Sequence, residues 1–278
     1  MILLSNFYVK DHVKSALQED IGFGDVTTES IIGEDKVFSA QLTSRADGIV
    51  CGLEVFKMVY SILSDRVNVE LLFKDGDEIK KGDVLAKLTG PGKYLLLGER
   101  ASLNYIQRMS GIATETNKYQ SAIGNLPCKI VDTRKTTPNF RPFEKYAVKC
   151  GGGALHRFNL SDCAMIKDNH IKVAGSVTNA VKMVKANLSH AHKIELECDT
   201  IEQIKEALPL GVDIIMLDNM TLDQMKEAVK LIDHKAIVEA SGNVTLDTVR
   251  QIAQCGVNII SSSAIVAKAP TLDLGIDM

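Results

Sequence analysis

The chain has 278 residues and a net charge of -3, and 45% of its residues are hydrophobic while 24% are charged. This composition is typical of a globular protein with one large domain or two smaller ones. The mild acidity disfavours nucleic acid as the main partner, because a surface that follows phosphates normally carries a strong basic excess.

Cysteine usage and the amino terminus bear on the cell compartment. Six cysteines are spread far apart without a Cys-X-X-Cys pair, which disfavours a structural zinc site and a disulfide framework. After Met1, the first apolar run has only three residues, too few for a secretory signal, and no later run approaches the ~18 apolar residues of a membrane span. We therefore expect a cytoplasmic protein with reduced thiols.

The first part of the chain mixes helical and strand patterns. Apolar residues recur at helical spacing in 10–18 and 53–63, whereas 37–50 alternates like a strand with a turn. Glycine-containing turns then separate further strands before a long helix begins. These patterns predict a small α+β domain over 1–108, on which we expect the carboxyl-terminal tail 268–278 to pack.

After Asn125 the chain changes to short apolar runs that each end in a polar or charged residue and are separated by helical stretches. This alternation predicts repeated βα units and a parallel sheet. Six such units favour closure into an α/β barrel related to the TIM fold, in which active sites lie at the carboxyl ends of the strands. We assign this catalytic domain to 109–267. The residues that end the six runs are Asp132, Lys167, Glu197, Asp218, Ser241 and Ser261.

The stretch 132–170 gathers cations beside turns and at the ends of apolar runs. A protein with a net negative charge does not need them there for solubility, so we infer an anionic ligand. Arg134 and Arg157 offer planar forks for carboxylate or phosphate, whereas Lys135 and Lys167 supply point charges. For any one of them alone, a solvated surface charge is the alternative. The nine cations are Arg134, Lys135, Arg141, Lys145, Lys149, His156, Arg157, Lys167 and His170.

Two acidic residues end successive predicted strands. Glu197 and Asp218 are therefore expected to lie close together in the barrel, facing the cations. Paired carboxylates can hold Mg²⁺, which commonly accompanies a phosphorylated substrate. The alternative is that one of them caps a helix or pairs with a lysine.

Further candidates lie in two serine clusters and beside a glycine run. Ser241-Gly242-Asn243 and Ser261-Ser262-Ser263 each precede a helical stretch, where hydroxyls and free N–H groups bind phosphate, although serine is also an ordinary helix cap. The glycines 151–153 are not a P-loop, because no Gly-Lys-Ser/Thr follows. His156, beside Arg157, is a candidate ligand donor or acid/base group, and a structural histidine is the alternative.

Several of these segments together resemble the quinolinate phosphoribosyltransferase family. The resemblance lies in DTRKTTPNFRPFEKYAVKCGGGALHR, MIKDNH, IELEC, IIMLDN and VEASGN, and earlier in ALQEDIGFGDVTTE, DGIVCGLEV and LLLGERASLNYIQRMSGIAT. It runs over nearly the whole chain. It implies a small open-sandwich domain followed by an incomplete α/β barrel of about seven strands. It also implies a homodimer in which the first domain of one subunit covers the barrel of the other.

The resemblance implies a reaction as well. Quinolinate and phosphoribosyl pyrophosphate would give nicotinate mononucleotide, pyrophosphate and carbon dioxide, in the presence of Mg²⁺. The implied catalytic residues are Lys135, Lys167, Glu197 and Asp218, with Glu197 and Asp218 also holding the metal, directly or through water. The implied substrate-binding residues are Arg100 from the partner subunit, Arg134, His156, Arg157, Lys167, Ser241, Gly242, Ser262 and Ser263.

The chain departs from the family pattern at the expected phosphate end. Asn243 stands where a second glycine is frequent, Ser263 replaces a glycine, and Ala267 replaces a histidine; we expect Lys268 or the hydroxyls to compensate.

The residues leave two rival functions open. One is the molybdenum-associated paralogue with a different acceptor, which MIKDNH disfavours. The other is a non-catalytic carrier or binding module, indicated by FKDGDEIKKGDVLAKLTG, which lacks the Met-Lys-Met type of attachment turn.

Overall fold

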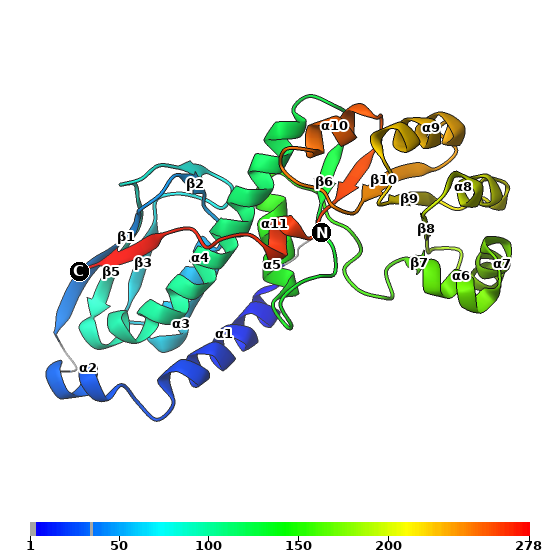
Figure 1. Cartoon of the computed structure of the whole chain (residues 1–278). Coiled ribbons are helices and arrows are strands. Elements are labelled where there is room, and N and C mark those ends of the chain that lie inside the picture. Colours follow the sequence, from blue (N-terminus) through cyan, green and yellow to red (C-terminus); the bar gives the residue numbers. More distant parts are fainter. Residues whose placement is uncertain (1–3, 34–35) are drawn as a thin grey trace. The chain divides into compact units, whose positions relative to one another are not determined.

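The computed structural model describes residues 4–33 and 36–278, and its chain forms two compact units (Figure 1). The first unit contains the chain up to Asn117 together with Thr137–Gly152 and Ala269–Met278. The second unit contains Lys118–Thr136 and Gly153–Lys268. The expected domain boundary at residue 108 lies inside helix α4, which runs from Gly92 to Ile123.

The first unit is built around a four-stranded antiparallel sheet of order β12-β1-β5-β3. Its core contains the buried side chains of Leu42, Phe56, Tyr60 and Ile106. The elements are α1 (Asn6–Ile21), α2 (Val26–Ile31), β1 (Val37–Ser44), β2 (Gly48–Ile49), α3 (Leu53–Leu63), β3 (Asn68–Leu71), β4 (Glu78–Ile79), β5 (Val84–Pro91), α4 (Gly92–Ile123), α5 (Arg141–Cys150) and β12 (Leu274–Asp277).

Helix α5 belongs to the first unit because buried polar contacts tie it there. Glu144 is fully buried and forms an ion pair with Arg108 of α4, with 2.9 Å between Oε1 and Nη2. The hydroxyl of Tyr146 donates to Asp75, whose other carboxylate oxygen accepts the N–H of Leu53 at the start of α3. These partners lie far from α5 in the sequence, so local patterns do not reveal them.

The second unit contains a six-stranded parallel sheet of order β6-β11-β10-β9-β8-β7. An isolated parallel bridge joins Ala154 to Val131 beside β6, so six strands and one bridge stand where about seven strands were expected. The elements are β6 (Lys129–Val131), β7 (Ala164–Ile166), α6 (Asp168–Ala174), α7 (Val177–Asn187), β8 (Ile194–Cys198), α8 (Ile201–Ala207), η1 (Leu208–Leu210), β9 (Ile214–Asp218), α9 (Leu222–Ile232), β10 (Ile237–Ser241), α10 (Val249–Gln254), β11 (Ile259–Ser261) and α11 (Ala264–Ala267).

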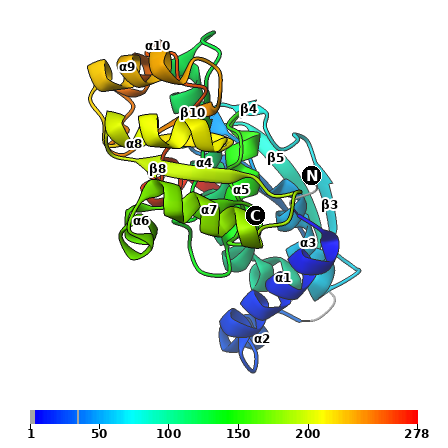
Figure 2. The same cartoon turned by 90° about the vertical axis from the view of Figure 1, so that its right-hand side faces the viewer.

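The predicted fold class is confirmed: an antiparallel sheet unit accompanies a parallel, barrel-like α/β unit. Figures 1 and 2 show helices α6 to α10 along the outer side of the sheet. Thr200 and Thr221 begin α8 and α9 with reciprocal capping hydrogen bonds to Gln203 and Gln224. Each cap fixes where a strand-to-helix loop ends, and these loops surround the carboxyl ends of the strands. Across the described residues, no helix is long and apolar enough to cross a membrane.

The last strand depends on a close passage over α4. The amide of Leu272 donates to the carbonyl of Gln107, and β12 then pairs antiparallel with β1. A Cβ atom on Gly111 would lie 1.9 Å from the carbonyl oxygen of Pro270. Only glycine permits this passage without a shift of the backbone.

Gly111→Ala should therefore destabilise the protein by about 1–3 kcal/mol, the usual cost of forcing an extra methyl into a filled space. Urea unfolding of the purified variant measures this loss. Gly33→Ala is the matched control, because nothing lies within 4 Å of a Cβ at that position. Equal stability of the two variants would contradict the close passage.

Candidate active site at the carboxyl ends of the parallel strands

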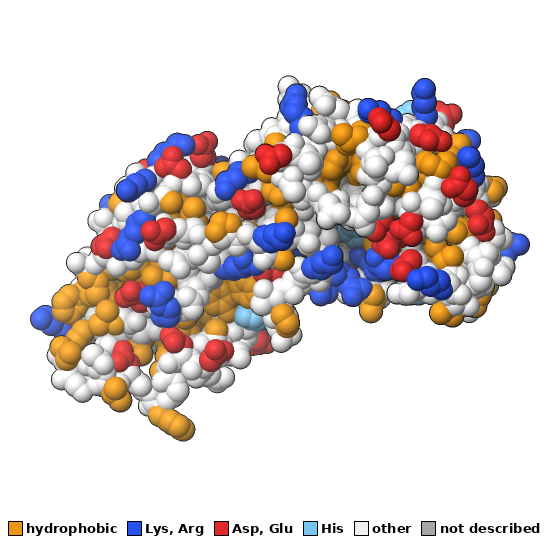
Figure 3. Space-filling model, viewed as in Figure 1, with side chains coloured by type: hydrophobic (Ala, Val, Ile, Leu, Met, Phe, Trp, Pro, Cys, Tyr) orange, Lys and Arg blue, Asp and Glu red, His pale blue; other side chains and the backbone are white. Residues whose placement is uncertain are grey.

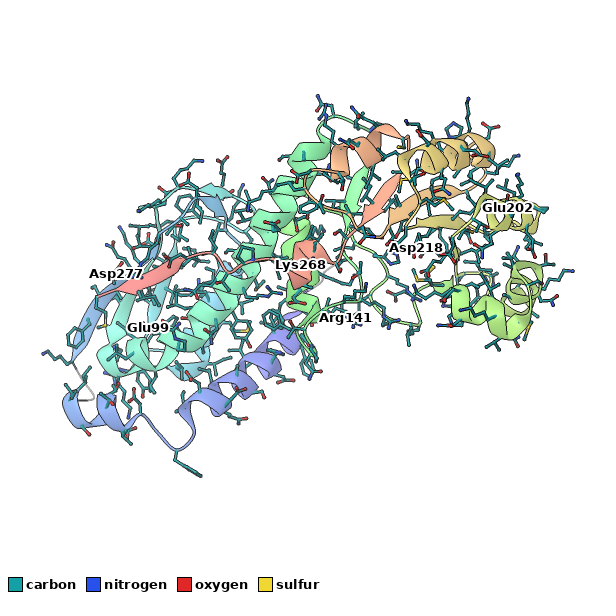
Figure 4. All side chains as sticks on the ribbon, viewed as in Figure 1. Glu99, Arg141, Glu202, Asp218, Lys268 and Asp277 are labelled. Atoms are coloured by element: carbon teal, nitrogen blue, oxygen red, sulfur yellow. The ribbon has the colours of Figure 1, made fainter. Side chains whose placement is uncertain are left out.

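A pocket with a volume of about 670 Å³ opens at the carboxyl ends of the parallel strands in the second unit. In Figure 3, basic and acidic side chains adjoin on the viewed face of this unit, and Figure 4 labels Asp218 and Lys268 there. The predicted site residues that line the pocket are Arg134, Lys135, His156, Arg157, Lys167, Glu197, Asp218, Ser241, Gly242, Ser262 and Ser263.

Some of the sequence candidates lie outside this pocket. Arg100 is an exposed residue of α4 in the first unit, and within the described residues it forms neither a hydrogen bond nor an ion pair. His170 is exposed, and its Nδ1 accepts the backbone N–H of Lys167 at the start of α6. Of the nine cations in the stretch 132–170, three belong to the first unit: Arg141, Lys145 and Lys149.

The two predicted metal ligands lie on neighbouring strands beside a lysine. Lys167 donates from Nζ to Oε2 of Glu197, and the side-chain amide of Asn219 donates to Oδ2 of Asp218 at 2.8 Å. Burial raises the pKa of Asp218, and the negative charge of Glu197 raises it further. Glu197 thus pairs with a lysine, which is the alternative that the sequence left open. A divalent cation held with Asp218 would relieve the repulsion between the two carboxylates.

Arg157 presents an unused hydrogen-bonding edge. Its Nη1 donates to the carbonyl of Cys163 at 2.9 Å, while Nη2 lies 3.3 Å from the sulfur of Met165, a weak acceptor. Its Nε is buried and has no hydrogen-bond partner among the described residues. Nε and Nη2 together form the edge that binds a carboxylate with two parallel hydrogen bonds.

His156 lies against buried acids inside the barrel. Its Nε2 is 3.4 Å from a carboxylate oxygen of Glu195 on β8 and 3.4 Å from one of Glu239 on β10. Its backbone N–H donates to Asp132 at 2.8 Å, and its Nδ1 accepts the backbone N–H of Arg157 at 2.7 Å.

The charges around His156 determine where its proton lies. Burial alone lowers the pKa of His156, but hydrogen bonds and charges from Glu195 and Glu239 outweigh this effect and raise the pKa to about 9. Burial also raises the pKa of Glu195. Because Nδ1 accepts the N–H of Arg157, the ring carries its proton on Nε2, which faces the two carboxylates.

Arg134 and Lys135 are held by the loop that follows β6. The backbone N–H of Lys135 donates to the hydroxyl of Thr133, and the N–H of Thr136 donates to the carbonyl of Arg134, each at 3.0 Å. This tight loop brings two consecutive cations to the pocket wall. Arg134 is half-buried, whereas Lys135 is exposed.

The expected phosphate end is formed by turns after β10 and β11. Gly242 and Asn243 both have positive φ, 91° and 52°, and a Cβ on Gly242 would lie 2.2 Å from Oδ1 of Asn219. Asn243 donates to the same Oδ1 at 3.0 Å. Asparagine tolerates the left-handed conformation better than most residues, so Asn243 both supports this turn and braces Asn219. Lys268 lines the pocket, while the neighbouring Ala267 does not.

Sequence reasoning missed Glu195 and Glu239, and it gave Asp132 no partner. Side chains two residues apart in a strand point to the same face. Glu195 therefore shares the inner face of β8 with Glu197, and Glu239 shares that of β10 with Ser241. This period of two was visible in IELEC and VEAS, and it is the signal that could have found both residues.

A second hollow of about 720 Å³ lies near the amino-terminal ends of β10 and β11. It is lined by the ends of α9 and α10, with Lys226, Lys230 and His234 among its residues. The cations, paired acids and hydroxyls described above line the other pocket, at the opposite ends of the strands. We therefore take the pocket of about 670 Å³ as the candidate active site.

Two family profiles match the chain on either side of residue 111. The N-terminal domain of quinolinate phosphoribosyl transferase matches residues 25–110, and the C-terminal domain of the same family matches residues 112–277. The segment that resembles a carrier module falls inside the first of these matches, so the carrier interpretation is not supported.

Similar proteins agree over almost the full length. A probable nicotinate-nucleotide pyrophosphorylase [carboxylating] of Bacillus subtilis is 42% identical, covering 99% of this chain and 95% of its own. A quinolinate phosphoribosyltransferase [decarboxylating] of Nicotiana tabacum is 39% identical, covering 96% of this chain and 81% of its own. The crystal structure of NadC from Streptococcus pyogenes has a TM-score of 0.96 at 39% identity, covering 99% and 97% of the two chains. The chain belongs to the quinolinate phosphoribosyltransferase family.

Proposed function

We propose that the pocket at the strand ends carries out the reaction of this family. The chain is a quinolinate phosphoribosyltransferase (decarboxylating), a pentosyltransferase of the de novo route to NAD. It transfers the phosphoribosyl group of phosphoribosyl pyrophosphate to quinolinate, and nicotinate mononucleotide, pyrophosphate and carbon dioxide are the products.

The observation that carries the residue assignment is the edge of Arg157 formed by Nε and Nη2, which has no strong acceptor among the described residues. A buried N–H without a partner costs free energy, and Nε of Arg157 is such a group beside a weakly bonded Nη2. A ligand carboxylate supplies both missing acceptors. Arg134, Lys135 and Lys167 line the same pocket and can balance the second carboxylate of quinolinate and the phosphates of the other substrate.

Glu197 and Asp218 are proposed to hold Mg²⁺, either directly or through water. When bound, Mg²⁺ neutralises charge on the pyrophosphate leaving group. The two carboxylates also favour positive charge that develops on the ribose as pyrophosphate departs. Lys167, which donates to Glu197, orients that carboxylate and brings a cation to the boundary between the two substrates.

The bonding changes need no nucleophile from the protein. The bond from the ribose C1 to pyrophosphate breaks, and the quinolinate ring nitrogen forms the new bond to C1. The carboxylate at the ring carbon next to this nitrogen then leaves as carbon dioxide. The electron pair of the broken bond stays on that carbon, where the cationic ring nitrogen stabilises it, and a proton from water then adds there. The residues of this chain bind, orient and balance charge, so the cysteines take no part.

We propose that Ser241, Gly242, Ser262 and Ser263 receive the 5′-phosphate, together with Lys268. Lys268 is exposed and lines the pocket. It supplies the cation that Ala267 does not provide.

Direct product analysis tests the function. Purified protein with quinolinate, phosphoribosyl pyrophosphate and Mg²⁺ should form nicotinate mononucleotide and release carbon dioxide in equal amounts. Nicotinate in place of quinolinate should give neither product. Turnover of nicotinate, or of another acceptor in preference to quinolinate, would refute the proposal.

Arg157→Lys should raise the KM for quinolinate at least about tenfold, because a lysine keeps the charge but cannot make two parallel hydrogen bonds. The KM for phosphoribosyl pyrophosphate should change much less. Steady-state kinetics with each substrate varied in turn measures both constants. An unchanged KM for quinolinate would remove Arg157 from carboxylate binding.

Glu197→Gln should weaken the response to Mg²⁺. The neutral amide leaves Asp218 as the single charged ligand, so the Mg²⁺ concentration for half-maximal activity should rise several-fold. Glu202→Gln is the matched control, because Glu202 lies on α8, away from the pocket (Figure 4). An identical Mg²⁺ titration for the two variants would contradict the proposed metal site.

We also propose that the active form is a homodimer in which Arg100 serves the pocket of the partner subunit. This rests on the family resemblance and on the side chain of Arg100, which is exposed and has no partner in the part of the chain that the structure describes. Arg100→Ala and Arg134→Ala should each be inactive alone. An equimolar mixture that exchanges subunits should recover about a quarter of wild-type activity, since half of the dimers then contain one intact site out of two. A mixture that stays inactive despite exchange would refute the shared site.

A further inference from the structure

His156 and Arg157 are held by three acids that lie inside the barrel. Asp132, Glu195 and Glu239 follow or belong to three different strands, and each is at most 1% exposed. Asp132 accepts the backbone N–H of His156. Glu195 and Glu239 both face Nε2 of its ring at 3.4 Å.

Keeping two carboxylates at this depth is costly. Apart from the ion pairs with His156, neither oxygen of Glu195 has a hydrogen-bond partner among the described residues, and the same is true of Oε1 of Glu239. Replacing buried ionic groups by apolar side chains of similar size is often neutral or stabilising. These acids are therefore poorly explained by stability alone, and a role in positioning accounts for them better.

Both ring nitrogens of His156 are already engaged by the protein. Nε2 faces the two glutamates, and Nδ1 accepts the backbone N–H of Arg157. A ligand carboxylate in the pocket finds neither nitrogen available in this orientation. The imidazole instead links the buried acids to the main chain of Arg157.

The contact between the ring of His156 and the main chain of Arg157 also determines where the edge formed by Nε and Nη2 of Arg157 lies. The main chain of Arg157 is fixed by His156 Nδ1 at one end of the residue, and Nη1 is fixed by the carbonyl of Cys163 at the other. Between these two anchors, Nε is buried without a partner and Nη2 has only a sulfur neighbour. A shift of the imidazole would therefore change the direction of the carboxylate-binding edge.

We propose that Glu195 and Glu239 are positioning residues for the substrate carboxylate, acting through the ring of His156 on Arg157. The inference rests on the proposed function, because it assumes that a carboxylate of quinolinate occupies the edge of Arg157. It gives His156 a different task from the direct contact with substrate that the family resemblance implies.

Glu239→Gln tests this role with almost no change in volume. The amide presents an N–H or a neutral oxygen to Nε2, so the ring is held less firmly. The Kd for quinolinate alone, measured by calorimetry, should rise at least about tenfold. The KM for phosphoribosyl pyrophosphate and kcat at saturating quinolinate should each stay within about twofold.

Two further variants separate positioning from general damage. Glu195 faces the same Nε2, so Glu195→Gln should show the same selective loss of quinolinate affinity. It serves as the test if Glu239→Gln does not fold. Glu206→Gln is the matched control. The carboxylate of Glu206 lies outside the pocket and accepts hydrogen bonds from the N–H and the hydroxyl of Thr178. It should bind quinolinate as the wild type does.

A double-mutant cycle shows whether the effect passes through His156. When His156 is already changed to Ala, adding Glu239→Gln should cause no further loss of quinolinate affinity, because the connecting ring is absent. Additive losses would overturn the inference. So would unchanged quinolinate binding in both glutamine variants, or equal losses for both substrates. A wild type that does not bind quinolinate would instead refute the proposed function.

Discussion

Charges that are removed from water must be paired, and this constraint shapes the second unit. The barrel interior holds Glu195 and Glu239, which are almost completely buried. Both carboxylates face Nε2 of His156, at 3.4 Å from each. The two glutamates therefore hold the imidazole ring of His156 through Nε2. In the next residue, Arg157, the edge formed by Nε and Nη2 has no strong acceptor among the described residues.

The parallel sheet converts this local arrangement into an active site. All six strands end at one edge, so cations after β6 and β7, acids at β8 and β9, and hydroxyls after β10 and β11 reach one pocket. A dicarboxylate and a polyanionic sugar need opposite ends of such a pocket. We propose that the edge of Arg157 serves the dicarboxylate at one end and that the turns around Asn219 and Gly242 serve the phosphate at the other.

Much of this pocket could be predicted because a polar residue lies at or just after the carboxyl end of each parallel strand, as Glu197 and Asp218 do. What could not be predicted depends on contacts distant in sequence. Helix α5 belongs to the first unit through Glu144 and its ion pair with Arg108. The period of two in IELEC could have placed Glu195 on the inner face, but only the structure shows that His156 is its partner. The task proposed for Arg100 involves a second subunit and rests on the family resemblance.

The central claim is that the edge of Arg157 formed by Nε and Nη2 receives a carboxylate of quinolinate. A crystal structure of the protein with quinolinate bound tests it most directly. The account predicts that both nitrogens lie within hydrogen-bonding distance of one carboxylate, at about 2.7–2.9 Å, while the ring of His156 keeps its place between Glu239 and the N–H of Arg157. A carboxylate bound directly by His156, with Nε of Arg157 still unpaired, would contradict it.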